Sequence, residues 1–230
     1  MKLFLLGHAG GSPAAYVPLF SDLGRSHELI PLDLPGHGRR MGEPLLRNID
    51  DMVDDLGRIL RASVKCDPFA LFGHSMGGIL AHALAARLDE MSMTPAHVVI
   101  SSTCTPGRHH IPPQFPSLGD RELWRESSTY FGGMPDQIAA SPELMTLFAP
   151  VLRADLGAVL DYSPPTLPAI DAPVTAICGH ADIVDREDME VWRRHTTADY
   201  TVQVLTGSHF HLLERPDALE ALLWDVLGQS

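Results

Sequence analysis

The residues best suited to chemistry lie in a complete G-x-S-x-G pattern at residues 73–77, with Ser75 as its serine. The apolar run at 68–72 predicts a buried strand before the pattern, and helical spacing of apolar residues predicts a helix over 76–88. A sharp turn between strand and helix presents a serine hydroxyl at the end of a sheet, ready to act as a nucleophile. The alternative is a serine that only caps the helix. The strand and helix around the motif favour the nucleophile.

A serine nucleophile needs a histidine base and an acid that orients the base. In sheets that carry this motif the chain order is serine, acid, histidine, so the base is expected after the last strand. The loop 206–212 follows the run 202–205 directly, and His209 in this loop is the predicted base. His211 is only two residues further along, and spacing alone leaves it open, although its apolar neighbours favour a structural role.

The acid is expected at the end of the preceding strand. The run 174–178 is followed by a glycine turn and Asp182, which is the predicted acid, with Asp185 in reserve. Either aspartate could instead cap the next helix.

Two main-chain N–H groups are expected to hold the oxyanion that develops during acyl transfer. One is that of Met76, directly after the nucleophile. The other is assigned to Ala9, because His8-Ala9-Gly10-Gly11 is similar to the H-G-G-type loop of esterases and follows the first predicted strand.

The elements that must position these residues alternate along the chain. Short apolar runs predict strands, and amphipathic patterns between them predict helices. These helices are expected from Leu46, after Ser75 and after Pro216. This pattern is typical of a mostly parallel sheet with helices on both faces, so the fold class is α/β, with the motif pointing to the α/β-hydrolase fold. The predicted strands are 2–6, 29–32, 69–72, 98–100, 174–178 and 201–205.

The segment from about 106 to 168 interrupts this alternation. It has no convincing strand, and ten of the 19 prolines fall in it. A coil of that length is improbable inside a compact domain, so a helical lid insertion over the carboxyl ends of the strands is predicted. Most of its large apolar residues are expected only to pack the insertion onto the body. They are Phe115, Trp124, Tyr130, Phe131, Met134, Met145, Phe148 and Tyr162.

Composition narrows the class of protein. The 230 residues, 45% of them hydrophobic, are expected to form a single domain over 1–230. No run is long enough for a membrane span, and the first residues lack the features of a signal peptide, so a cytoplasmic protein is expected. A net charge of -12 argues against nucleic acid and anionic membranes as partners. Nothing in the sequence demands a second subunit, so a monomer is expected.

Cysteine and histidine spacing gives no metal site. Cys66, Cys104 and Cys178 are odd in number and far apart, which indicates free thiols. The 12 histidines include the adjacent His109 and His110, but no H-x-x-x-H or C-x-x-C pair occurs, and most histidines are expected at the surface or in loops.

Six motifs, taken in order, resemble those of type II thioesterases, the discrete editing enzymes of nonribosomal peptide and polyketide synthesis. The resemblance covers nearly the whole chain, and LRADL is its most specific part. The family triad falls on Ser75, Asp182 and His209, which favours Asp182 over Asp185. Family members usually have residues before the first strand, so the sheet is expected to be short by an edge strand. The motifs are HAGG (8–11), LPGHG (34–38), FGHSMGG (72–78), GGMP (132–135), LRADL (152–156) and GSHF (207–210).

The resemblance implies hydrolysis of acyl thioesters on the phosphopantetheine arm of an acyl or peptidyl carrier protein, with no cofactor of the enzyme's own. Because carrier proteins are generally acidic, docking is expected at a local basic patch. The alternatives are a small-molecule esterase or amidase of the same fold and a hydrolase-fold binding protein without catalysis. The arginines considered for docking are Arg39 and Arg40, or Arg108, Arg121 and Arg125.

Overall fold

The computed structural model describes residues 1–64, 67–133 and 135–228, and its centre is a six-stranded parallel sheet in the order β2-β1-β3-β4-β5-β6. This confirms the predicted fold class. Every predicted strand is present, and all but the first differ from the prediction by one or two residues at an end. The strands are β1 (Lys2–Leu6), β2 (Glu28–Pro31), β3 (Phe69–His74), β4 (His97–Ser101), β5 (Val174–Gly179) and β6 (Tyr200–Leu205).

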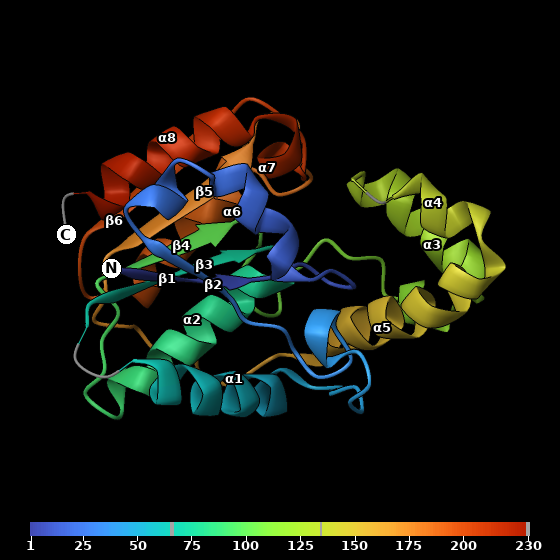
Figure 1. Ribbon diagram of the computed structural model, residues 1–230, viewed down its shortest axis with the longest axis horizontal. Helices are drawn as coiled ribbons and strands as arrows, with labels where there is room; N and C mark the ends of the chain where they lie inside the picture. Colours follow the sequence, from blue (N-terminus) through green and yellow to red (C-terminus); the bar gives the residue numbers. More distant parts are fainter. Residues whose placement is uncertain (65–66, 134, 229–230) are drawn as a thin grey trace.

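The register brings the carboxyl ends of the strands to one edge of the sheet. Leu6 pairs with Gly73 at the end of β1 and β3, and Gly179 pairs with Leu205 at the end of β5 and β6. In parallel sheets, side chains from the loops after these ends meet in a crevice. Figure 1 shows this edge facing the group of helices α3, α4 and α5.

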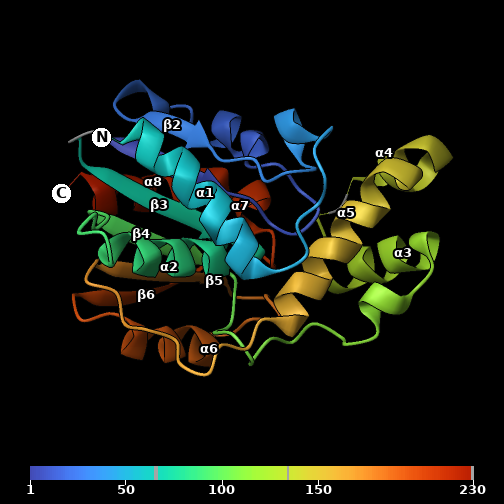
Figure 2. The same ribbon diagram turned by 90° about the horizontal axis from the view of Figure 1, so that it is seen from below.

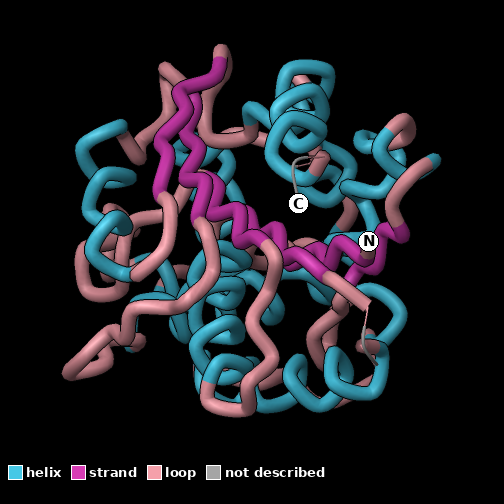
Figure 3. Tube along the Cα trace, turned by 90° about the vertical axis from the view of Figure 1, so that its left-hand side faces the viewer, coloured by secondary structure: helices cyan, strands magenta, loops and turns pink. Residues whose placement is uncertain are grey.

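Helices cover both faces of the twisted sheet, as Figure 3 shows. On one face, α1 (Ile49–Ser63), α2 (Met76–Asp89) and α6 (Arg186–Glu190) share a buried apolar cluster with the sheet. On the other face, the 3-10 helices η1 (Pro13–Phe20) and η2 (Leu23–Arg25) pack with α8 (Pro216–Leu227). The remaining short helices are η3 (Gly38–Arg40), η4 (Phe115–Ser117), η5 (Val191–His195) and α7 (His211–Glu214).

Helix α1 begins later than the apolar pattern from Leu46 suggests. Asn48 is its N-cap, and the Asn48 side chain accepts a hydrogen bond of 2.8 Å from the Asp51 amide. An N-cap asparagine fixes where a helix starts because it satisfies an amide that has no partner within the helix. Leu46 therefore packs from the preceding loop.

The described part of 106–168 contains helices and no strand of the sheet. It holds α3 (Asp120–Phe131), α4 (Asp136–Ala140) and α5 (Pro142–Asp161), which Figures 1 and 2 show as a group beside the sheet. We call these three helices the helical insertion. Its own apolar cluster includes Phe115, Trp124 and Met145, so these side chains pack the insertion together, whereas we expected them to pack it onto the body. Met134, also expected here, lies outside the described residues.

Helix α5 packs in two apolar clusters, that of the insertion and that of the sheet. Met145 and Ala149 in its first half pack in the cluster of the insertion, whereas Ala158 and Val159 near its end pack in the main cluster of the sheet. Pro150 lies between the two halves. None of the described helices combines the length and hydropathy that a membrane span requires.

Candidate active site

Ser75 occupies the turn between β3 and α2, as the motif predicts. Its backbone has φ 55° and ψ -121°, a conformation that non-glycine residues rarely adopt. The Ser75 amide donates to the Ser101 carbonyl at 2.8 Å, and the Ser75 carbonyl accepts from the Gly78 amide at 2.9 Å. These bonds hold the strained turn and leave the side chain facing a pocket.

The glycines of the motif are required by close packing of the backbone. A Cβ on Gly73 would lie 1.9 Å from the Gly77 carbonyl oxygen, and a Cβ on Gly77 would lie 2.3 Å from the Leu6 carbonyl oxygen. No side chain fits at either distance. The turn can therefore be this tight only with glycine at both positions.

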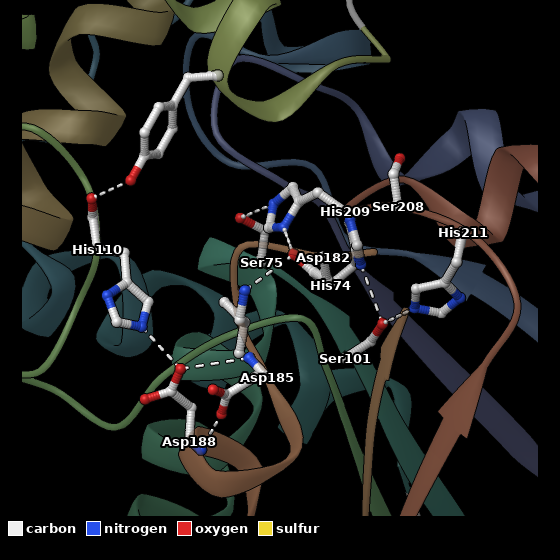
Figure 4. A network of polar contacts seen from close by, with 12 residues as sticks. His74, Ser75, Ser101, His110, Asp182, Asp185, Asp188, Ser208, His209 and His211 are labelled. Atoms are coloured by element: carbon white, nitrogen blue, oxygen red, sulfur yellow. Dashed lines mark hydrogen bonds and ion pairs between the residues drawn. The ribbon is translucent and has the colours of Figure 1, made fainter. Parts of the chain in front are cut away.

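His209 joins Ser75 to Asp182. Its Nε2 lies 3.2 Å from the Ser75 Oγ, and its Nδ1 lies 2.9 Å from the Asp182 Oδ1, as Figure 4 shows. The carboxylate is an acceptor, so it favours the tautomer with the proton on Nδ1, which leaves Nε2 free to accept the serine proton. The structure thus brings together the three residues predicted from the sequence.

The Asp182 carboxylate is fully buried and charged. Burial alone would raise its pKa, but His209, the nearby Ser102 hydroxyl and the Val184 amide lower the pKa below the usual value of an aspartate. The Val184 amide donates to Asp182 Oδ1 at 3.1 Å. Asp185, the reserve candidate, instead caps α6 by accepting from the Asp188 amide at 2.9 Å.

The loops that carry the acid and the base are bonded to one another. The Ala181 amide donates to the Gly207 carbonyl at 3.0 Å, and the Gly207 amide donates to His180 Nδ1 at 3.0 Å. The Ser208 amide donates to a carboxylate oxygen of Glu214 at 3.0 Å. These contacts fix the backbone on both sides of the His209–Asp182 pair.

A second serine–histidine contact lies behind the first. His211 Nε2 and His74 Nδ1 each lie 3.0 Å from the Ser101 Oγ, as Figure 4 also shows. Ser101, His74 and His211 are all fully buried, and Ser101 does not line the pocket. A nucleophile must reach its substrate, so this contact supports the site from behind. His211 is therefore not placed to be the base of Ser75.

Five of the 12 histidines are buried, and the other seven are at least partly exposed, so most lie at the surface or in loops, as expected. The buried ones are His37, His74, His82, His209 and His211. Burial, followed by the charges of nearby histidines, holds the pKa of His74 well below its usual value. His74, His82 and His211, whose pKa values burial lowers, serve as neutral core groups, which hydrophobic patterning does not predict.

A pocket opens at Ser75 and His209. Its space is about 680 Å³, including the open mouth. Ala9 and Met76 line it beside Ser75, and helix α5 contributes Leu152, Leu156 and Val159 to its wall. Within the described part of the chain, the amides of Ala9 and Met76 donate to no protein acceptor. Both N–H groups are thus available at the pocket that contains the serine.

Three side chains with metal-ligand atoms meet at the pocket wall. The ligand atoms of Cys104, His110 and Asp188 lie within 4.8 Å of one another. His110 Nε2 lies 2.7 Å from Asp188 Oδ2, and burial, with the neighbouring carboxylates, raises the pKa of the Cys104 thiol to about 12. The hydrogen bond between His110 and Asp188 accounts for the closeness of these side chains. Cys104 and Cys178 are free thiols as expected, and Cys66 lies outside the described residues.

Two contacts from the helical insertion were not predicted. The Phe131 ring lies 5.2 Å from the His209 ring, centroid to centroid. Asp155 accepts hydrogen bonds from the Gly10 amide and His37. The LRADL motif was a signal for Asp155, but a motif alone does not show which side chain it meets.

Comparison with known proteins identifies the family of the chain. A family model for the thioesterase domain matches residues 1–227. The chain belongs to the thioesterase family. Thioesterase TesA of Mycobacterium marinum is 31% identical over 91% of this chain and 84% of its own length. The gramicidin S biosynthesis protein GrsT of Aneurinibacillus migulanus is 29% identical over 93% of this chain and 84% of its own length.

Solved structures extend the likeness to the fold. The type II thioesterase BorB from the borrelidin biosynthetic cluster superposes with a TM-score of 0.88 and 32% identity, over 98% of this chain and 92% of BorB. The resemblance inferred from the motifs is thereby confirmed: this thioesterase is a thioester hydrolase of the type II class with an α/β-hydrolase fold.

Proposed function

We propose that this thioesterase hydrolyses acyl thioesters with Ser75 as nucleophile, His209 as base and Asp182 as the acid that orients it. The observation that carries the proposal is the position of His209, with Ser75 on one ring nitrogen and Asp182 on the other, at the wall of a pocket. His209 takes the proton of Ser75 as the Oγ bonds to the thioester carbonyl carbon.

The tetrahedral intermediate then collapses. The C–S bond breaks, and the thiol leaves with the proton that His209 returns. Water enters, His209 takes a proton from it, and the hydroxide attacks the carbonyl carbon of the acyl-enzyme. The C–Oγ bond then breaks, the acid leaves, and His209 returns the proton to the Ser75 Oγ. In each half, the amides of Ala9 and Met76 stabilise the oxyanion, because both line the pocket beside Ser75.

The substrate class is an acyl group on the phosphopantetheine arm of a carrier protein, and the reaction frees arms that carry a wrong or stalled acyl unit. The type II class and the relative GrsT, a protein of gramicidin S biosynthesis, support this substrate. Apolar residues of α5 and Phe131 would contact the acyl chain. We propose that the helical insertion acts as the lid of a single-domain, monomeric, cytoplasmic enzyme.

The proposed carrier surface lies around the insertion. Arg40 is engaged with Glu43 and Asp55, and Arg125 with Glu122 and Glu126, so both are neutralised within the chain. Of the five arginines considered for docking, three are exposed and have no ion pair with the described residues, so they are the better candidates. They are Arg39, Arg108 and Arg121.

The test is mass spectrometry of the acyl-enzyme together with turnover. Wild-type enzyme is mixed with acyl-carrier protein, and a mass increase on Ser75 is expected. Ser75→Ala should lose the adduct and about a millionfold in kcat. Ser101→Ala is the matched control, because it removes the other serine bonded to a histidine, and it should still form the adduct on Ser75.

Two results would contradict the proposal. An adduct that persists in Ser75→Ala and disappears in Ser101→Ala would move the nucleophile to Ser101. Much faster turnover of free p-nitrophenyl esters than of acyl-carrier thioesters would favour the esterase alternative.

A further inference from the structure

The loop that carries Ala9 is held on both sides of that residue. The His8 amide donates to the Tyr16 hydroxyl at 3.1 Å, and the Gly10 amide donates to Asp155 Oδ2 at 2.7 Å. Ala9 lies between them, and its own N–H has no acceptor within the described protein. The direction of the free N–H group is therefore set by the bonds of its neighbours.

Asp155 reaches this loop from the helical insertion. It lies on α5, and its side chain is fully buried. Its Oδ2 accepts from the Gly10 amide and also lies 2.8 Å from His37 Nε2. A buried carboxylate is unfavourable unless it is paired and hydrogen-bonded, and here one oxygen has both kinds of partner.

His37 supplies the positive partner. Its Nδ1 lies 3.1 Å from the Pro35 carbonyl oxygen and its Nε2 faces Asp155, so both ring nitrogens face acceptors and both carry protons. Burial by itself would lower the pKa of His37, but Asp155, the Pro35 carbonyl and Asp33 outweigh it and raise the pKa above its usual value. His37 and Asp155 therefore form a charged pair.

Leu152, one helical turn before Asp155, contacts the same residue of the loop. Gly10 has φ 76°, and a Cβ placed on it would lie 3.2 Å from the Leu152 Cβ. The backbone of the loop thus lies directly on α5. Leu152 sets the distance between the loop and the helix, and Asp155 sets the orientation of the Gly10 amide.

We propose that Asp155 is a positioning residue for the oxyanion hole, holding the Gly10 amide so that the Ala9 N–H points at the oxyanion on Ser75. The inference rests on the proposed function, because it assumes that the oxyanion forms there. His37 supports Asp155 as its charged partner. The helical insertion would then form part of the catalytic apparatus as well as the pocket wall.

The experiment compares two probes on Asp155→Ala. An acyl-pantetheine trifluoromethyl ketone adds the Ser75 Oγ to its carbonyl carbon, gives the serine proton to His209 and leaves an oxyanion in the hole. The matching amide binds the same pocket without that step. We expect kcat and affinity for the ketone to fall together by about 10-fold to 100-fold, because small misplacements of a catalytic group have effects of that size. Amide affinity and KM should change by less than about twofold.

Two further variants sharpen the comparison. Asp155→Asn keeps an oxygen for the Gly10 amide but loses the charge, so we expect a smaller loss of ketone affinity, about threefold to tenfold. This variant keeps the test decisive if the alanine variant does not fold. Asp161→Asn, an exposed change in the last turn of the same helix, is the matched control and should behave as wild type.

The outcomes separate this inference from the proposed function. Unchanged kcat in folded Asp155→Ala, beside an inactive Ser75→Ala, would overturn the positioning role alone. Equal losses of ketone and amide affinity would also overturn it, because they would indicate a general effect on the pocket. Full activity of Ser75→Ala would overturn the proposed function and this inference with it.

Discussion

In the proposed mechanism, one ring nitrogen of His209 must accept a proton while the other donates a hydrogen bond. Asp182 accepts that hydrogen bond with a fully buried carboxylate that is charged at neutral pH. The proton on Nδ1 is thereby held in place while Nε2 faces Ser75 at 3.2 Å. An uncharged amide in the same position could not enforce that tautomer.

We predict that Asp182→Asn lowers kcat by about 10⁴-fold with little change in KM, because the asparagine permits the wrong tautomer of His209. Steady-state kinetics with an acyl-pantetheine thioester measures it. The matched control is Asp185→Asn, since asparagine is also a good N-cap and should keep both α6 and the activity. Equal losses in the two variants would contradict the assignment of the acid.

Most catalytic candidates could be predicted from the sequence, because each lies in the turn or loop that follows a strand. Ser75, Asp182 and His209 come after β3, β5 and β6, and the parallel sheet brings those ends together. Asp155 and Phe131 could not be placed in this way. They lie on helices whose orientation depends on tertiary packing, which hydrophobic periodicity does not determine.

At the scale of elements, the helical insertion contacts the site through α3 as well as α5. Phe131, the last residue of α3, lies with its ring 5.2 Å from that of His209 and lines the pocket. Arg153 of α5 donates to the Leu118 carbonyl and to Asp120, both at 2.6 Å, at the start of α3. These contacts tie α3 to α5, so Phe131 keeps its place over the base.

We predict that Phe131→Ala raises KM for acyl-pantetheine thioesters by about tenfold, because about 1 to 2 kcal/mol of apolar contact with the acyl chain is lost. The kcat should fall by a smaller factor than KM rises, because Ser75, His209 and Asp182 remain in place. Thr129→Ala, an exposed change on the same helix, is the control and should leave KM unchanged. A variant with wild-type KM would show that the acyl chain does not contact α3.

At the scale of the whole molecule, the fold contains several histidines that remain neutral. Burial lowers the pKa of His211 to about 4; Asp182 and Glu214 oppose this shift, and His209 adds to it. In the unfolded chain the same residue titrates near pH 6.5. Between these two values the unfolded state binds the extra proton, so stability is present above about pH 6.5 and is lost as the pH falls toward 4.

We predict that His211→Gln reduces this acid sensitivity. From pH 7 to pH 5 the wild type should lose about 2 kcal/mol more of its unfolding free energy than the variant does, because glutamine takes up no proton. Urea denaturation at the two pH values measures the difference. The variant will be less stable at pH 7 if the bond to Ser101 matters, but only the change with pH tests the prediction. Equal losses of unfolding free energy from pH 7 to pH 5 in the wild type and the variant would contradict the prediction.

The division of α5 at Pro150 has a mechanical consequence. Proline has no N–H to donate to the carbonyl four residues earlier, so the helix is least stiff against bending at that point. Beyond it, Asp155 is bonded to the Gly10 amide, Val159 packs in the main cluster of the sheet, and Arg153 is bonded to the start of α3. Bending at Pro150 would therefore move the start of α5, which carries Met145, and leave in place the second half of the helix, which lines the pocket and holds Gly10.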